Sequence, residues 1–297
     1  IRIQRYYLPV MFEIQNTKEI PLLRVNAHVF KHSGFGCTHL HLDCDSTEKA
    51  FSVAFRTIPK DHSGIAHILE HTVLCGSEKF PVRDPFFMMT RRSLSTFMNA
   101  MTYPDITAYP FATLNDKDYR NLLSVYLDAA FFPNIDELDF MQEGHRFELI
   151  KDGDKEKLAL KGVVYNEMKG AMSSVPRQLW HEVSKSLYPT TTYGFNSGGD
   201  PDFIPDLTYA DLKNFHKKYY HPAMAGLFSS GNVDASALQQ DVDTAGLKKF
   251  TPKLDNLRVN PEPAFELEQY SHSYYNPLPD DENNHHVVVA WLLGSTK

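Results

Sequence analysis

HILEHTVLCGS, residues 67–77, places two histidines and a glutamate on a single turn of an otherwise apolar segment. The periodicity predicts a helix over residues 64–75. Because residues three and four apart share one face of a helix, His67, Glu70 and His71 project together. Two imidazoles one turn apart can both reach one zinc ion at about 2.0–2.1 Å. The acid between them lies where a base is needed to take a proton from the attacking water.

The spacing of these three residues is the HxxEH order found among metallopeptidases. With 14 histidines in 297 residues, a chance match has a probability of roughly a few per cent. The alternative is a surface helix whose polar face carries two histidines with ordinary hydrogen bonds. The motif favours a metal site and leaves that alternative open.

A third protein ligand is expected, because a catalytic zinc ion holds three side chains and keeps one position for water. LKGVVYNEMKGAM, residues 160–172, offers Glu167. On a helix this glutamate falls on the apolar stripe, where a carboxylate is costly unless it is paired. A metal ion is one such partner, and a contact with an arginine or with the backbone is the alternative. The stripe consists of Leu160, Val163, Val164, Met168 and Met172.

Three runs with a period of two precede the motif and predict strands over residues 21–30, 38–45 and 50–58. His39 and His41 alternate with the apolar residues of the second run, so an exposed polar face is expected for them. The side chains expected to face inward are Leu23, Val25, Ala27, Val29, Leu40, Leu42, Cys44, Phe51, Val53 and Phe55.

Helical periodicity dominates the rest of the chain. Ser63 is expected to cap the helix of the motif and Gly76 to end it. Strands and helices in this order indicate an α+β fold with a meander or mixed sheet. The further helices are expected over residues 93–99, 138–149, 160–172, 178–187 and 209–220, with one more that starts at Asp116, and the further strands over residues 106–114 and 225–231.

Composition limits the classes of function. The net charge of −7 and the lack of a long basic block argue against nucleic-acid binding. No run of eighteen apolar residues is present, so no membrane partner is expected. Three cysteines without a CxxC pair indicate reduced thiols. No GxSxG, P-loop or GxGxxG motif supports serine nucleophile chemistry or nucleotide binding.

The chain is expected to divide near residue 250. Residues 1–250 form the predicted catalytic domain, and residues 251–284 are rich in Pro, Asn and Asp and are expected to form a linker. Residues 285–297, which open with HHVVVAWLLG, are expected to start a second, truncated domain with a strand. The chain is therefore interpreted as part of a longer polypeptide.

Three segments together resemble the pitrilysin/insulinase family of zinc metallopeptidases, and within it the presequence-protease branch. They are HSGIAHILEHTVLCGSEKFPVRDPFF, SLSTFMNAMTYPDITAYPFATLNDKDYRNLLSVYLDAAFFPN and GVVYNEMKGAM. The similarity runs from about residue 20 to 230. It implies a mixed, largely antiparallel sheet packed against several helices, and one zinc ion per chain.

The resemblance also implies a role for individual residues. His67, His71 and Glu167 would be the zinc ligands, and Glu70 the base that activates water. Asn99 and Ala100 would lie on an edge to which a substrate adds as a strand. Leu74, Phe86 and Phe87 would form an apolar pocket for the residue after the cut, and ordinary core packing is the alternative for these three.

The function implied is a zinc-dependent endopeptidase that degrades short unfolded peptides, such as cleaved presequences. The partners are such peptides and the remaining domains of a longer polypeptide, without which this part of the protein is expected to have little or no activity. A non-catalytic scaffold or partner subunit of the same fold is the alternative. A bacterial cytoplasm is favoured as the compartment, with the mitochondrial matrix or a plastid as the alternative.

Overall fold

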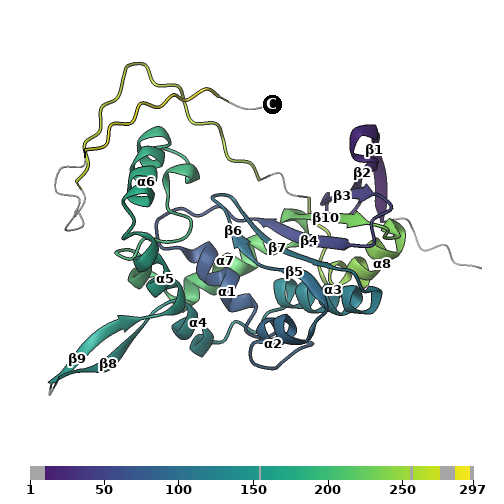
Figure 1. Cartoon of the computed structure of the whole chain (residues 1–297), viewed down its shortest axis with the longest axis horizontal. Coiled ribbons are helices and arrows are strands. Elements are labelled where there is room, and N and C mark those ends of the chain that lie inside the picture. Colours follow the sequence, from purple (N-terminus) through teal and green to yellow (C-terminus); the bar gives the residue numbers. More distant parts are fainter. Residues whose placement is uncertain (1–10, 154, 255–256, 275–284, 295–297) are drawn as a thin grey trace, which may run out of the picture.

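The computed structural model describes residues 11–153, 155–254, 257–274 and 285–294. Its centre is an eight-stranded sheet with the order β1-β2-β3-β10-β4-β7-β5, and β6 also pairs with β7. Paired strands are antiparallel, except that β10 runs parallel to β3. The predicted α+β fold with a mixed, largely antiparallel sheet is confirmed (Figure 1).

The elements follow one another in a mixed order. The strands are β1 (Phe12–Ile20), β2 (Val25–His32), β3 (Thr38–Asp43), β4 (Lys49–Arg56), β5 (Ser95–Met98), β6 (Met101–Thr102), β7 (Ile106–Thr113), β8 (Arg146–Asp152), β9 (Lys155–Lys161) and β10 (Ala225–Gly231). The α-helices are α1 (Ile65–Val73), α2 (Pro85–Arg92), α3 (Asp116–Phe131), α4 (Glu137–Glu143), α5 (Val163–Ala171), α6 (Val175–Leu187), α7 (Tyr209–Tyr219) and α8 (Ala235–Ala245). Single 3-10 turns are η1 (Pro21–Leu23), η2 (Thr192–Gly194), η3 (Ile204–Asp206), η4 (Pro222–Met224) and η5 (Leu247–Lys249).

Helices pack on the central strands of the sheet. The predicted inward face of β4 is confirmed, because Phe51, Val53 and Phe55 are at most 1% exposed. Helix α3 contacts β4 and β7, and α1 contacts β6, β7 and α7. The helix that carries the HxxEH motif is therefore held between the sheet and α7.

Two predicted helices are wrong, the first in type and the second in extent. Residues 93–99 contain strand β5, because pairing with β7 outweighs the weak helical periodicity of so short a run. Residues 138–149 divide at Gly144, where α4 ends and the chain turns into the β8–β9 hairpin. Helices α2 and α8 and strands β1, β6, β8 and β9 were not predicted. The predicted strand over residues 21–30 starts only at Val25, because Pro21–Leu23 form a 3-10 turn in which Leu23 is 65% exposed and does not face inward. The other helices and strands predicted within residues 1–250 are confirmed, with shifts of a few residues at their ends.

The expectation of an exposed polar face for His39 and His41 is wrong, because both side chains are at most 3% exposed. His39 Nδ1 accepts a hydrogen bond of 3.0 Å from Gln239 Nε2, which lies on α8. His39 Nε2 and His41 Nδ1 each lie 2.8 Å from Ser229 Oγ. An amide nitrogen only donates, so His39 is neutral and donates from Nε2 to the serine. Helix α8 thus buries the polar face of β3, and the histidines on that face form a hydrogen-bond network inside the protein.

The predicted strand at residues 285–294 is not formed in the structure. These residues have no regular secondary structure, and most of their side chains are exposed. Residues 251–254 and 257–274 of the predicted linker are likewise irregular, and residues 275–284 and 295–297 lie outside the described residues. The domain boundaries near 250 and 284 stay a prediction. In the described parts of the chain, none of the helices is long and apolar enough to span a bilayer.

The buried histidine network predicts a loss of stability in acid. Burial and the neighbouring His41 lower the pKa of His39 to about 3, and burial also lowers the pKa of His41. The unfolded chain therefore binds more protons than the folded chain from pH about 6.5 down to about 3, so stability falls as the pH falls through this window. Urea unfolding between pH 7.5 and 5 measures it, at up to about 1.4 kcal/mol per pH unit for each histidine. The variant His39→Gln reduces this slope, and an unchanged slope would contradict the account.

Candidate metal centre

Helix α1 presents the motif on one face by burying the rest of its surface. The buried residues besides Glu70 are Ile65, Ala66, Ile68, Leu69, Thr72 and Val73. The sequence predicted Ser63 as the N-cap of this helix. That prediction is wrong, because the N-cap is Gly64. Gly64 has a φ of +68°, and a Cβ there would lie only 2.7 Å from the Cα of Gly199. Only glycine lets the start of α1 approach the 198–199 segment this closely.

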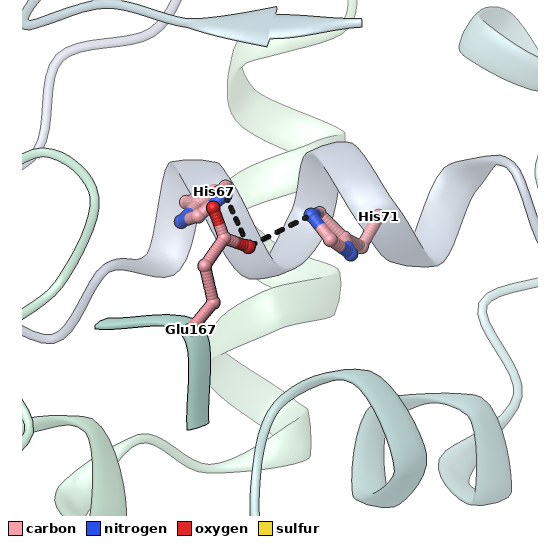
Figure 2. A group of neighbouring side chains, drawn as sticks. All are labelled: His67, His71 and Glu167. Carbon is pink, nitrogen blue, oxygen red and sulfur yellow. Dashed lines mark ion pairs between the residues drawn. The ribbon is translucent and has the colours of Figure 1, made fainter. Parts of the chain in front are cut away.

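The structure brings His67, His71 and Glu167 together, as predicted (Figure 2). Glu167 Oε2 lies 3.8 Å from His67 Nε2 and 4.0 Å from His71 Nε2. One ligand atom from each residue lies within 4.8 Å of the other two. A tetrahedral ion with ligands at about 2.0–2.2 Å separates its ligand atoms by about 3.3–3.6 Å. Small side-chain movements would close this difference, so the three residues fit a zinc ion.

The reason given for Glu167 from the sequence is wrong, although the residue lies at the site. Its side chain is 55% exposed and does not belong to the buried stripe. Val164 and Met168 form the buried side of α5, while Val163 is exposed. Helix α5 packs against α4, which in turn packs against α1. This packing directs Glu167 toward the two histidines.

The Nδ1 atom of each histidine of the motif forms a hydrogen bond with a neighbouring group, on the side of the ring away from the site. His67 Nδ1 lies 2.9 Å from the carbonyl oxygen of Gly198 and donates to it. His71 Nδ1 lies 3.1 Å from Glu143 Oε2, and Gln142 Nε2 donates to the other oxygen of Glu143 at 2.9 Å. With the proton on Nδ1, each ring turns its Nε2 lone pair toward the site. Such partners fix the tautomer and the orientation of metal-binding histidines.

Charge favours a protonated His71 when no metal is bound. Burial acts to lower the pKa of His71, but the hydrogen bond that His71 donates to Glu143 and the negative charges of Glu70, Glu143 and Glu167 outweigh it and raise the pKa. Burial acts to raise the pKa of Glu143, and its hydrogen bonds with His71 and Gln142 outweigh that and lower it. The site concentrates negative charge around two imidazoles, which suits a divalent cation.

Glu70 lies on the same turn and is 7% exposed. Its Oε2 accepts a hydrogen bond of 2.6 Å from Thr102 Oγ1 on strand β6. This contact fixes the orientation of the Glu70 carboxylate. The sequence did not single out Thr102, Glu143 or Gly198. They lie 32, 72 and 131 residues from their partners in the chain, so no local spacing marks them.

The predicted substrate-binding residues occupy different surroundings. Asn99 and Ala100 lie between β5 and β6 at the edge of the sheet, and Asn99 is exposed with its N–H bonded to the Pro110 carbonyl. Leu74 and Phe86 are 7% and 8% exposed and belong to the core. Phe87 is 57% exposed. The edge position is therefore as expected, while Leu74 and Phe86 match the alternative of core packing.

Two family models match this chain. The model described as "Insulinase (Peptidase family M16)" covers residues 56–168, which include the HxxEH motif and Glu167. The model described as "Peptidase M16 inactive domain" covers residues 206–297. The chain belongs to the M16 peptidase family. The family assignment agrees with the resemblance that the motifs indicated.

Among M16 proteins, mitochondrial presequence proteases are similar over nearly the whole chain. That of Danio rerio is 44% identical over 95% of this chain, and that of Mus musculus is 45% identical over 95%. This chain spans 28% of the length of either relative. The expectation of a bacterial cytoplasm finds no support, because these relatives are named as mitochondrial.

Solved structures support the fold. A protease from Helicobacter pylori has a TM-score of 0.62 at 19% identity, over 80% of this chain and 53% of that protein. Pitrilysin has a TM-score of 0.61 at 16% identity, over 87% of this chain and 26% of its own. The fold is thus shared at low sequence identity.

Glu143 is expected to strengthen metal binding without touching the ion. The variant Glu143→Gln keeps the size of the side chain but removes the charge that favours Nδ1–H on His71. Zinc affinity, measured by competition with a chromophoric chelator, is expected to fall by about 10- to 100-fold. Glu137→Gln, on the exposed side of the same helix, is the control with unchanged affinity. Equal affinities for the two variants would contradict this role.

Proposed function

We propose that this chain is the catalytic part of a zinc-dependent endopeptidase. The observation that carries the proposal is the meeting of His67, His71 and Glu167 beside Glu70. Two histidines and one carboxylate form a known catalytic zinc ligand set that leaves a position open. One zinc ion per chain, held by these three residues, accounts for the arrangement. The retention of all four residues favours a catalyst over a scaffold of the same fold.

The chemistry follows from where the side chains lie. A zinc ion bound there would polarise the scissile carbonyl and lower the pKa of a water molecule. Glu70 takes the proton from the attacking water, and the hydrogen bond from Thr102 to Oε2 holds its carboxylate in place. It then returns that proton to the nitrogen of the leaving amine. Gly198 and Glu143 keep the histidine rings in the orientation that this step needs.

Short unfolded peptides are the substrates that the edge of the sheet suits. Asn99 and Ala100 lie at an edge, and an extended peptide can pair with such an edge as an added strand. Phe87 offers an exposed ring for the side chain after the cut. A segment of an unfolded peptide can extend along this edge without first breaking other structure, so unfolded peptides are favoured over folded proteins. The names of the relatives favour cleaved presequences as substrates and the mitochondrial matrix as the compartment.

The proposal is tested with Glu70→Gln. This variant keeps the hydrogen-bonding shape but cannot accept the proton, so cleavage of an unstructured fluorogenic peptide is expected to fall by about 10²- to 10⁴-fold. The full-length gene product is the enzyme assayed, because this chain spans only part of its relatives. Zinc content, measured by mass spectrometry of the purified protein, is expected to stay at one ion per chain. Full activity in Glu70→Gln, or wild-type protein that takes up no zinc, would refute the proposal.

Thr102 is expected to position Glu70. The variant Thr102→Val keeps the shape of the side chain and removes the hydroxyl that bonds to Oε2. A hydrogen bond to a charged group contributes about 1.5–3 kcal/mol, so kcat is expected to fall by about tenfold or more while KM changes little. Thr102→Ser restores the hydroxyl and most of the rate. If Thr102→Val and Thr102→Ser have equal rates, the hydroxyl has no such role.

A further inference from the structure

The β8–β9 hairpin has one bare apolar face. Phe147 stands directly opposite Leu160, and Leu149 stands opposite Leu158, so all four side chains lie on the same side of the ribbon, with the pair Lys151 and Glu156 beyond them toward the turn. Phe147, Leu149 and Leu158 are 68%, 70% and 59% exposed. Single exposed apolar residues are common on protein surfaces, but a contiguous set of large ones marks a contact surface.

The opposite face of the hairpin has a different character. It carries Arg146, Glu148, Lys157 and Lys161, with Ile150 and Ala159 between them. Glu148 accepts a hydrogen bond from Arg146 Nε at 2.7 Å. The ribbon is therefore amphipathic, as a strand pair is when one face packs on protein and the other meets water.

The described part of the chain leaves the apolar face uncovered. Figure 1 shows the hairpin projecting away from the sheet and helices. A two-stranded ribbon alone is marginally stable in water and needs a packed face to persist. A cover for this face must therefore come from outside the described residues.

The base of the hairpin is firmly held, so the hairpin presents its face in a fixed direction. Arg146 Nη1 donates to the carbonyl oxygens of Met141 and Gln142 on α4, at 3.2 and 3.4 Å. A Cβ on Gly162 would lie 1.9 Å from the carbonyl oxygen of Gly144. The backbone before β8 and the backbone after β9 are thus in direct contact. Only glycine at position 162 permits this contact.

We propose that the apolar face of the β8–β9 hairpin docks onto another domain of the same, longer polypeptide. The presequence proteases that this chain resembles are more than three times as long, because the chain spans 28% of their length. A surface tethered to the same chain has an effective concentration of about millimolar, which a second copy in solution does not reach. The inference does not depend on the peptidase activity proposed above.

The position of the hairpin makes this contact relevant to the candidate site. The hairpin follows Glu143 on α4 and precedes Glu167 on α5. The hairpin thus joins the two helices that carry these acids, so a domain that docks on it would contact the connection between α4 and α5.

Site-specific photocrosslinking in the full-length gene product tests the proposal. The photoreactive p-benzoylphenylalanine replaces Phe147, with Leu158 as a second position if the first variant fails to fold. The matched control carries the same group in place of Ile150, on the opposite face. After irradiation, digestion and mass spectrometry are expected to find crosslinks from position 147 or 158, and few from 150, to peptides beyond residue 297 of the same molecule.

Several results would overturn the proposal. These are crosslinks only to a second copy, crosslinks only within residues 1–297, equal crosslinks from both faces, or a gene product that ends near residue 297. Hydrogen exchange gives a second measurement: Leu149→Glu is expected to speed exchange of the hairpin amides by about tenfold or more relative to Ile150→Glu. Both readouts are independent of zinc and of peptide cleavage, so the docking proposal and the peptidase proposal can fail separately.

Discussion

Close backbone approach at glycines is the constraint on which the candidate site depends. The start of α1 meets the 198–199 segment at Gly64, and the start of α5 meets the end of α4 at Gly162. A side chain at either position would clash with the facing backbone and push the elements apart. Elements far apart in the chain are thereby held at the distances that His67, His71 and Glu167 require. The chemistry of the site rests on these two packing contacts.

The same contacts also explain why both histidines have hydrogen-bond partners that fix the orientation of their rings. The 198–199 segment that packs on Gly64 also offers the carbonyl that accepts from His67. The α4 end that packs on Gly162 also offers Glu143 to His71. Each close approach therefore brings in both a ligand-bearing element and a group that orients a ligand. Loss of either contact would disturb the metal site and its support together.

Local patterns predicted the parts of this protein that depend on local structure. His67, Glu70 and His71 lie on one helical turn, so their spacing alone places them together. Glu167 was chosen for burial that it does not have, and its true position depends on the packing of α5 against α4. His39 and His41 were misplaced because their partners, Ser229 on β10 and Gln239 on α8, lie 188 to 200 residues away in the chain. Partners that only tertiary packing supplies, such as Glu143 and Thr102, leave no trace in sequence spacing.

The central claim is that three side chains hold one zinc ion, and X-ray absorption at the zinc edge tests it most directly. Protein loaded with one equivalent of zinc is expected to show two imidazoles and oxygen ligands at about 2.0–2.2 Å. The thiol of Cys75, whose Sγ lies 3.5 Å from the carbonyl oxygen of His71, is expected to contribute no ligand. A sulfur ligand at about 2.3 Å, or a spectrum without two imidazoles, would contradict the account.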